Sequence, residues 1–416
     1  MALLVQKFGG SSVGTIERIQ HVARRVAKYK EAGHQLVVVV SAMQGETDRL
    51  LGLAGKLSES PEPREVDQLL ATGEQASAAL LAMALQTMGI RARSMTGHQM
   101  KVMTDGAFSR ARIKNLDGAG MREYLNDGEV IVATGFQGID DSGNITTLGR
   151  GGSDTSAVAL AVGLDADECI IFTDVDGVYT ADPRICPKAK KIDQICFEEM
   201  MEMASLGSKV LQIRSVELAM NHGMPLRVRS TFSDDEGTLV TTENDSIEKL
   251  VVRGVSHSTQ DAKFTLRRVP DQPGVASSIF LSLARAGLNV DVIVQNTSRE
   301  GTTDVSFTVA QTDALEAENL MKEISLDIGA ESIEVDSNIA KVSIVGVGMR
   351  AHAGVAAEMF DALRVGGINI QMITTSEIKV TVVIEEKDCA AAVQCLHEAF
   401  QLAGEQSEKP QDRVSA

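Results

Sequence analysis

The chain has 416 residues, enough for about two to four domains, each with its own core. Its formal net charge of −17, from 57 acidic and 40 basic residues, argues against nucleic acid or an anionic membrane as the main partner. No apolar stretch reaches the roughly 18 residues that span a bilayer, and the five cysteines have neither paired nor zinc-like spacing. We therefore expect a cytoplasmic protein with reduced thiols.

The chain opens with a glycine turn. The apolar run 3–5 leads into Lys7-Phe8-Gly9-Gly10-Ser11-Ser12, and a stretch of helical periodicity follows over 15–31. Glycines let the backbone approach an anion, a helix N-terminus offers unpaired N–H groups, and Lys7 adds a full charge. The six residues match neither the Walker pattern nor G-x-G-x-x-G. Alone, they fit a phosphate loop and an ordinary strand-to-helix turn equally well.

Short apolar runs alternate with helical stretches from residue 1 to about 231. The runs at 36–40, 130–133 and 169–173 are typical of buried parallel strands. This alternation predicts an α/β domain with a mainly parallel sheet and helices on its faces. The polar, acidic segment 233–245 indicates the end of that domain.

The strand expected at 36–40 ends at Ser41, and a turn with Gly45 and Thr47 follows. A further helical run is expected to begin near Thr72-Gly73-Glu74. At a helix start, Glu74 could simply complement the helix dipole. It could equally face the amino group of a ligand, and the sequence leaves both interpretations open.

A second glycine cluster, Gly149-Arg150-Gly151-Gly152-Ser153-Asp154, precedes an apolar helix. Ser153 or Asp154 could be an ordinary N-cap. Capping does not explain three glycines with an arginine among them, whereas a guanidinium can bind a carboxylate or phosphate through two parallel hydrogen bonds.

A third cluster, Thr173-Asp174-Val175-Asp176-Gly177-Val178-Tyr179, follows the strand expected at 169–173 and continues to Arg184. It is not an EF-hand loop, because positions six and twelve hold Tyr179 and Ile185. Loops at the carboxyl ends of parallel strands bind ligands in α/β sheets. Tyr179 and Arg184 could therefore flank a nucleotide, the alternative being a solvated turn.

The C-terminal part contains an internal repeat. Gly274, Phe280, Gly287, Asn289 and Ile293 recur 80 residues later as Gly354, Phe360, Gly367, Asn369 and Ile373. We expect a first domain over 1–245, a linker over 246–262, modules over 263–340 and 341–405 that exchange strands or pair, and a disordered tail over 406–416.

These motifs, in this order, resemble the amino-acid kinase family, and within it the aspartokinase group; the repeats are similar to paired ACT modules. The resemblance implies a three-layer αβα kinase domain followed by two ferredoxin-like βαββαβ modules. It implies transfer of a phosphoryl group from ATP, with Mg²⁺, to the side-chain carboxylate of aspartate, as the first step towards lysine, threonine and methionine. It also implies feedback by lysine, threonine or both, and a homodimer or larger homo-oligomer assembled through the ACT modules.

The resemblance also assigns site residues. Catalytic roles fall on Lys7 and Asp154. Aspartate binding falls on Ser41, Thr47, Glu74, Arg150, Gly151, Gly152 and Ser153. Nucleotide binding falls on Lys7, Phe8, Gly9, Gly10, Thr173, Asp174, Tyr179, Arg184, Lys209 and Val210. Effector binding falls on Asp271, Ala276, Asn289, Gln295, Asn369 and Ile370, and no residue is assigned to metal.

A carboxylate acceptor agrees with the residues. A carboxyl group with a pKa near 4 is already ionised at neutral pH, so no general base is required, and none of the seven histidines lies in a glycine cluster. The alternatives are a non-catalytic sensor of amino acids and nucleotides, or a kinase for another carboxylate such as acetylglutamate. Lys7, Glu74, Arg150 and Asp154 are all present, which favours an enzyme.

Overall fold

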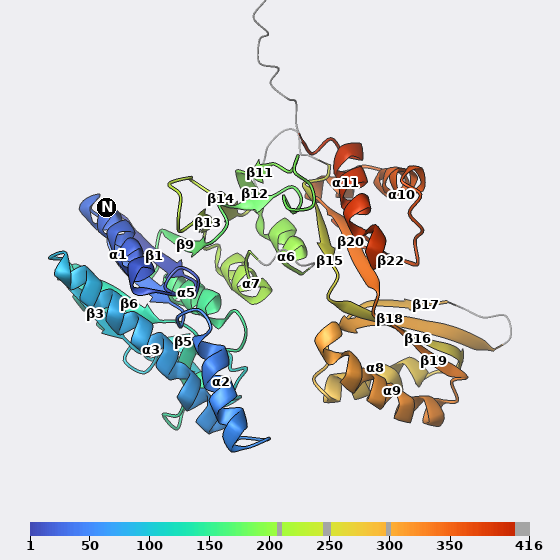
Figure 1. Cartoon of the computed structure of the whole chain (residues 1–416), viewed down its shortest axis with the longest axis horizontal. Coiled ribbons are helices and arrows are strands. Elements are labelled where there is room, and N and C mark those ends of the chain that lie inside the picture. Colours follow the sequence, from blue (N-terminus) through green and yellow to red (C-terminus); the bar gives the residue numbers. More distant parts are fainter. Residues whose placement is uncertain (206–209, 244–250, 297–300, 404–416) are drawn as a thin grey trace, which may run out of the picture. The chain divides into compact units, whose positions relative to one another are not determined.

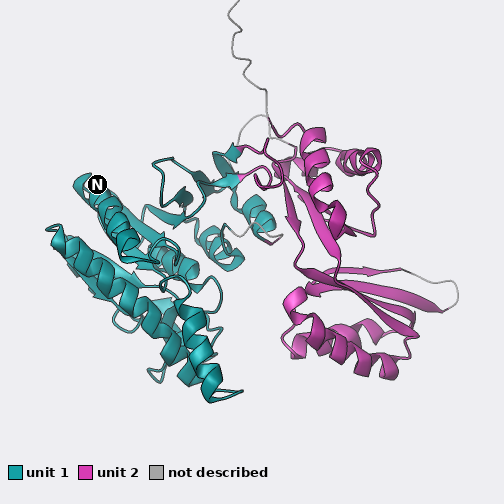
Figure 2. Ribbon diagram, viewed as in Figure 1, with its two compact units in different colours: residues 1–178, 191–204, 209–245 teal, residues 179–190, 205–208, 246–416 magenta. Residues whose placement is uncertain are grey.

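The computed structural model describes residues 1–205, 210–243, 251–296 and 301–403. These form two compact units (Figure 2). Unit 1 comprises Met1–Val178, Lys191–Ala204 and Lys209–Asp245, and unit 2 comprises Tyr179–Lys190, Ser205–Ser208 and Ser246–Ala416. Lys209 and the tail expected to be disordered, 406–416, lie outside the described residues.

Unit 1 is built on an eight-stranded sheet with the order β12-β14-β13-β9-β1-β2-β6-β3 (Figure 1). Every neighbouring pair is parallel except β13 and β14. The strands are β1 (Leu3–Phe8), β2 (Gln35–Val40), β3 (Ala92–Met95), β6 (Val130–Thr134), β9 (Glu168–Thr173), β12 (Gln194–Cys196), β13 (Leu226–Ser230) and β14 (Thr238–Thr241). The mainly parallel sheet predicted from the sequence is confirmed.

Helices cover both faces of this sheet. On one face, α1 (Ile16–Glu31) and α3 (Pro63–Thr87) pack against a core that includes Phe8 of β1 and Phe172 of β9, whose rings stack 4.6 Å apart. On the other face, α5 (Gly152–Gly163) contacts β1, β2 and β9, and α7 (Ile213–His222) packs on α5. Burial on both faces explains why β2 is apolar almost throughout. Side chains alternate along a strand, so Lys7 points away from Phe8 and towards α5.

The sequence did not predict a second, four-stranded sheet in unit 1, with the order β5-β4-β7-β8. Its strands are too short to show a clear periodicity. The strands of this sheet are β4 (Val102–Thr104), β5 (Ile113–Leu116), β7 (Gln137–Ile139) and β8 (Ile145–Thr147). The chain also forms the helices α2 (Glu46–Leu57), α4 (Ala119–Asn126) and α6 (Phe197–Ser205). A separate two-stranded sheet consists of β10 (Val178–Tyr179) and β11 (Lys191–Ile192).

Unit 2 contains two modules, each with an antiparallel four-stranded sheet. Module 1 consists of β16 (Asp261–Pro270), α8 (Val275–Arg285), β17 (Val290–Gln295), β18 (Thr302–Ala310), α9 (Ala314–Ile328) and β19 (Ser332–Asp336). Module 2 consists of β15 (Gly254–Ser258), β20 (Ile339–Val345), α10 (Val355–Val365), β21 (Met372–Thr375), β22 (Lys379–Glu385) and α11 (Cys389–Ala399). Short 3-10 turns are η1 (Gln311–Asp313), η2 (Val347–Ala351) and η3 (Glu386–Asp388).

Module 1 is inserted into module 2. Strand β15 lies within 246–262, which the sequence assigned to a linker, yet it pairs with β20 in the sheet of module 2. The chain therefore begins module 2, completes all of module 1, and then returns. The sequence did not indicate this strand because the residues around it are polar, and only its first three residues are buried.

The segment Tyr179–Lys190 also folds with unit 2, although the sequence placed it in the first domain. The hydroxyl of Thr180 lies 2.9 Å from Nε2 of the buried His397 on α11, and its carbonyl accepts the N–H of Val255 at 2.7 Å. Ala181 and Cys186 join the core of module 2. The segment is therefore part of the packing of that module.

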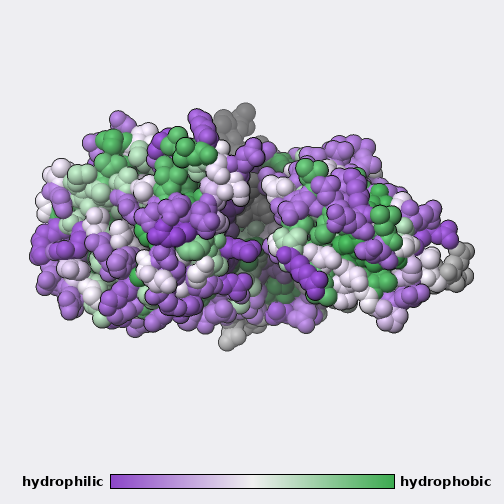
Figure 3. Space-filling view, turned by 90° about the horizontal axis from the view of Figure 1, so that it is seen from below, coloured by the Kyte–Doolittle hydropathy of each residue, from purple (hydrophilic) through white to green (hydrophobic). Residues whose placement is uncertain are grey.

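On the face shown in Figure 3, hydrophilic residues are interspersed with small hydrophobic patches. Such scattered apolar side chains are normal on a folded protein. Within the described part of the chain, no helix combines the length and apolar character needed to cross a membrane.

Candidate functional site

The glycine turn after β1 packs directly against the segment that follows β2. The turn is closed by the Ser12 N–H, which donates to the Gly9 carbonyl at 2.9 Å. A Cβ at Gly10 would lie 2.9 Å from the Ala42 carbonyl oxygen, so no larger residue fits there without moving backbone. Ser41 donates its N–H to the Phe8 carbonyl at 3.1 Å. The glycine turn and the Ser41-Ala42 segment thus form one surface at the carboxyl ends of β1 and β2.

Lys7 and Asp154 form an ion pair across the sheet–helix boundary. The Nζ of Lys7 lies 2.6 Å from Oδ1 of Asp154, and the two side chains are only 12% and 10% exposed. Lys7 comes from β1 and Asp154 from the first turn of α5. The structure therefore brings together the two residues to which the sequence assigned catalytic roles.

The N-cap interpretation of the second glycine cluster is wrong. The N-cap of α5 is Gly151, with φ of +70° and no side-chain capping bond, so Ser153 and Asp154 lie inside the helix. A Cβ at Gly151 would overlap the side chain of Gln212. Gly152 and Ser153 are buried or nearly so, and the side chain of Arg150 is exposed beside them. The side chain of Arg150 is thus exposed to solvent at a glycine-lined helix start.

A buried carboxylate that sequence reasoning missed supports this loop. Asp67 of α3 is fully buried and accepts hydrogen bonds from the N–H and hydroxyl of Ser109 and of Thr147, at 2.7 to 3.1 Å. Arg214 donates to the Leu148 carbonyl at 2.9 Å. These two contacts hold Thr147 and Leu148, the residues directly before Gly149-Arg150. No pattern in the sequence distinguishes Asp67 from a surface acid on a helix.

Glu74 is buried in the interior of α3. The helix begins at Pro63 and not near Thr72, so the helix-dipole explanation of Glu74 is wrong. Its side chain contacts the Ser41-Ala42 segment: Oε1 accepts the Ala42 N–H at 2.9 Å. Among the described residues, Oε2 has no hydrogen-bond partner, and the residue is 3% exposed. Burial raises the pKa of Glu74 to about 7.

An unpartnered carboxylate oxygen at this depth suits a cationic ligand group, because an amino group would supply both a charge and hydrogen bonds. Thr47 is half-buried in the first turn of α2. It follows Glu46, whose side chain lies beside Gly73 of α3. The structure thus brings Glu74 to the Ser41-Ala42 segment beside the glycine turn, and Thr47 lies on α2, the helix that contacts α3.

Thr173 and Asp174 lie at the carboxyl end of β9, next to β1 in the sheet. Thr173 is half-buried and donates its hydroxyl to the exposed Asp174 at 3.0 Å. The side chain of Phe8 is fully buried in the core, so only its backbone can face a nucleotide. Val210 is half-buried at the turn before α7.

Tyr179 and Arg184 belong to unit 2. Arg184 is 88% exposed and donates to Asp182, with Nη2 and Oδ2 2.7 Å apart. This contact lowers the pKa of Asp182. The Arg184 guanidinium is therefore exposed to solvent and held by the Asp182 carboxylate, on a segment that packs against module 2.

The residues assigned to an effector lie on the surface of the two modules. Asp271 and Ala276 flank the start of α8, and Asn289 and Gln295 bracket β17. Asn369 and Ile370 precede β21, which occupies in module 2 the edge position that β17 occupies in module 1. In the described part of the chain, no three histidine, cysteine or carboxylate side chains are grouped to hold a metal ion.

Comparisons with known proteins agree with this arrangement. Residues 2–230 match the model of the amino acid kinase family, and residues 267–323 and 342–400 match that of the ACT domain. The chain is 56% identical over 404 residues to an aspartokinase of Pseudomonas aeruginosa, covering 97% of this chain and 98% of that protein.

Two solved structures of one enzyme are similar over nearly the whole chain. E. coli aspartokinase III in complex with aspartate and ADP, in the R-state, aligns with a TM-score of 0.80 and 28% identity, covering 95% of this chain and 99% of that one. The same enzyme with lysine and aspartate, in the T-state, aligns with a TM-score of 0.78 and 28% identity, covering 96% and 99%.

The buried carboxylate predicts a gain in stability when it is neutralised. The folded protein holds the Glu74 proton more tightly than the unfolded chain, so its contribution to stability falls as pH rises from about 4.5 to above 7. We expect Glu74→Gln to be more stable than the parent at pH 8 by roughly 3 kcal/mol, because the pKa is raised from 4.5 to about 7 and each pKa unit corresponds to about 1.4 kcal/mol. The difference should shrink steadily between pH 7 and pH 5 in urea unfolding followed by circular dichroism.

Glu46→Gln is the matched control, because Arg49 lowers the pKa of Glu46 and its neutralisation should not stabilise the protein at pH 8. A Glu74→Gln variant no more stable than the parent at pH 8 would show that the Glu74 carboxylate is already paired with a cation.

Proposed function

Since the chain belongs to the amino acid kinase family, and within it to the aspartate kinases, we propose that it transfers the γ-phosphoryl group of ATP to the side-chain carboxylate of L-aspartate. The product is 4-phospho-L-aspartate, the first intermediate towards lysine, threonine and methionine. One observation carries the proposal: the glycine turn that follows Lys7 packs on the same Ser41-Ala42 segment that Glu74 contacts. A phosphate cradle and an acceptor for an amino group are therefore adjacent.

The open oxygen of Glu74 favours aspartate over acetylglutamate. Aspartate carries a free ammonium group that can pair with this carboxylate, whereas the nitrogen of acetylglutamate is an uncharged amide. Leaving Glu74 buried without a cation is costly, so a substrate without an ammonium group is discriminated against. We assign Arg150 to the α-carboxylate of aspartate, with Thr47 and Ser153 as further contacts to the substrate.

The acceptor carboxylate is ionised at neutral pH and needs no proton removed. One of its oxygens forms a bond to the γ-phosphorus while the bond between that phosphorus and the bridging oxygen of ADP breaks, and ADP leaves with the electron pair. Charge on the phosphoryl oxygens must be neutralised throughout. Lys7 supplies that charge, Asp154 holds Lys7 in place before the nucleotide binds, and Gly9 and Gly10 leave room for the phosphates.

Mg²⁺ belongs to the proposal as the ion that accompanies ATP. It is held in such sites mainly by phosphate oxygens and one or two carboxylates, and when bound it shares the neutralisation of charge with Lys7. Asp174 fits this task, because its carboxylate is exposed at the carboxyl end of β9. Asp154 is engaged with Lys7.

The reaction can be tested by trapping the acyl phosphate with hydroxylamine, which converts it to a coloured hydroxamate. We expect product from aspartate with ATP and Mg²⁺, and little from glutamate or acetylglutamate. Product from acetylglutamate alone would contradict the substrate assignment, and binding of ATP without product from any of the three would favour a non-catalytic sensor.

Lys7 provides a second test. Lys7→Ala should lower kcat by about 100-fold or more, because one preorganised charge on the transferring group is lost, and should change the KM for aspartate only a few-fold. Lys56→Ala, at the exposed end of α2, is the control and should behave like the parent. Near-normal turnover of the Lys7 variant would remove this lysine from the mechanism.

We further propose that lysine, threonine or both inhibit the enzyme by binding at the ACT modules, through Asp271, Ala276, Asn289, Gln295, Asn369 and Ile370. The complex of E. coli aspartokinase III with lysine supports an amino acid as effector. Tyr179 and Arg184, proposed for the nucleotide, lie on the segment packed against module 2. A change in module 2 on effector binding would therefore move this segment with it.

The ACT modules are also the proposed site of homo-oligomerisation. Ile293 on β17 and Ile373 on β21 occupy equivalent positions of the repeat, on edge strands, and are 50% and 44% exposed. Paired edge strands would cover both. The five cysteines are free and four of them are buried, which suits the reducing cytoplasm to which we assign the protein.

An exposed hydrogen bond between module 2 and the segment 179–190 can be removed by substitution. The amide of Gln394 on α11 donates to the Ile185 carbonyl at 2.7 Å. Because one hydrogen bond contributes about 1 kcal/mol, Gln394→Ala should raise the half-inhibitory concentration of the effector by about 3–5-fold while uninhibited kcat stays within two-fold.

Gln86→Ala is the matched control, since the Gln86 amide also donates to a backbone carbonyl, that of Ala92 in unit 1. An inhibition curve for Gln394→Ala that superimposes on that of the parent would show that this contact carries no coupling.

A further inference from the structure

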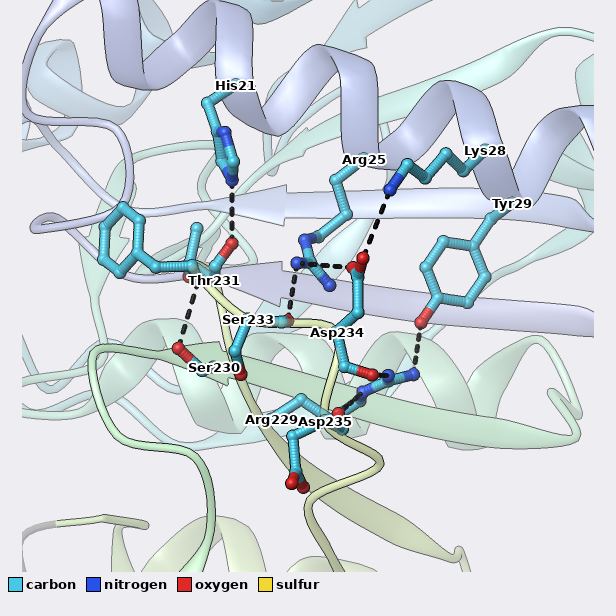
Figure 4. Close-up of polar contacts among 11 residues, drawn as sticks. His21, Arg25, Lys28, Tyr29, Arg229, Ser230, Thr231, Ser233, Asp234 and Asp235 are labelled. Atoms are coloured by element: carbon cyan, nitrogen blue, oxygen red, sulfur yellow. Dashed lines mark hydrogen bonds and ion pairs between the residues drawn. The ribbon is translucent and has the colours of Figure 1, made fainter.

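Thr231 joins three segments around the glycine turn. It is the first residue after β13 and is fully buried. Its N–H donates to the Thr173 carbonyl at 2.8 Å, and its hydroxyl lies 2.7 Å from the hydroxyl of Ser12. Its carbonyl lies 3.0 Å from Nε2 of His21, which points to it from α1 in Figure 4. No motif in the sequence indicated this residue.

The sheet explains why Thr231 reaches the turn. Strands β13, β9 and β1 are parallel neighbours, with Ser230 opposite Thr173 and Phe172 opposite Phe8. The chain beyond β13 therefore emerges beside the turn that follows β1. Thr231 is placed to contact Ser12, the last residue of that turn, and Thr173, the last residue of β9.

Helix α1 fixes both partners of this contact. Arg18 donates through Nη1 to the Ser11 carbonyl at 2.7 Å, and His21, one turn further along, contacts the Thr231 carbonyl. Ser11, Ser12, Thr231 and α1 therefore form a closed ring of hydrogen bonds. In that ring, the other two contacts involve the side chains of Arg18 and His21, whereas the Ser12–Thr231 contact joins two uncharged hydroxyl groups. A substitution can therefore remove the hydroxyl contact without leaving a charge buried.

The hydroxyl of a buried threonine often forms a hydrogen bond within its own sheet and has no further role. The pair formed by Thr104 and Thr146, 2.6 Å apart in the four-stranded sheet of unit 1, is of that kind. The Thr231 hydroxyl differs because its partner lies 219 positions away, in the turn that follows Lys7. Its loss would release the glycine turn from its neighbour at the end of β13.

We propose that Thr231 is a positioning residue for the nucleotide. Through Ser12 it holds the Gly9–Ser12 turn, and through its N–H it holds Thr173, so that both segments present a fixed surface to the phosphates of ATP. This role rests on the proposed function of the glycine turn. Thr231 acts on the reacting groups only through these segments, and its loss is expected to affect the nucleotide side of the site more than the aspartate side at Glu74 and Arg150.

The test compares Thr231→Val, which keeps the shape and removes the hydroxyl, with Thr231→Ser, which keeps the hydroxyl. The valine variant should raise the KM for ATP and the Kd for ADP, measured by calorimetry, by about ten-fold, with the KM for aspartate within two-fold. The serine variant should restore values near those of the parent. Thr104→Val is the matched control: it removes the same kind of hydroxyl pair and should leave nucleotide binding unchanged.

Ser12→Ala should reproduce the effect, and combining it with Thr231→Val should add little, because both remove one contact. Should Thr231→Val fail to fold, Ser12→Ala gives the same comparison. The proposal is overturned if ADP binding is unchanged in Thr231→Val or in Ser12→Ala, or if aspartate and ATP are affected equally. Failure of the proposed function is distinguishable in the parent protein, which would then bind no nucleotide or would bind it without forming hydroxamate from aspartate.

Discussion

The ion pair between Lys7 and Asp154 is the contact on which the site depends. Two opposite charges, each about nine-tenths buried, are held 2.6 Å apart between the central strand β1 and the first turn of α5. Removing charges from water is costly unless they are paired, so the pair fixes the distance between strand and helix. It also keeps a full positive charge beside the glycine turn, where we propose that the phosphoryl group binds.

The remaining parts of the site follow from the direction of the strands. Carboxyl ends of parallel strands meet at one edge of a sheet, and here β1, β2, β9 and β13 end together at the glycine turn, Ser41, Thr173 and Thr231. The helices that cover the sheet add Glu74 and Asp154 from opposite faces. The buried Glu74, whose Oε2 has no hydrogen-bond partner among the described residues, costs stability, which is typical of sites built for binding.

The sequence predicted much of this because its signals are local. Apolar runs gave the parallel strands, and glycine clusters gave the turns at Gly10 and Gly151, where neighbouring groups leave no room for a side chain. The repeat gave the two modules. Each of these signals depends only on residues close together in the chain.

The features it missed depend on contacts between distant residues. Asp67 and Thr231 look ordinary in sequence, and their roles arise only when the sheet brings them to Thr147 and Ser12. Strand β15 reads as linker because its partner β20 lies beyond all of module 1. The segment 179–190 was assigned to the first domain by its position, whereas its apolar residues are buried in module 2.

The most direct measurement of the central claim is a crystal structure with aspartate, Mg²⁺, ADP and aluminium fluoride as a mimic of the transferring phosphoryl group. The account predicts Nζ of Lys7 within hydrogen-bonding distance of the fluoride ligands, the substrate ammonium on Glu74, and Arg150 on a carboxylate. A complex in which Lys7 still contacts only Asp154, with the mimic bound away from the glycine turn, would contradict it.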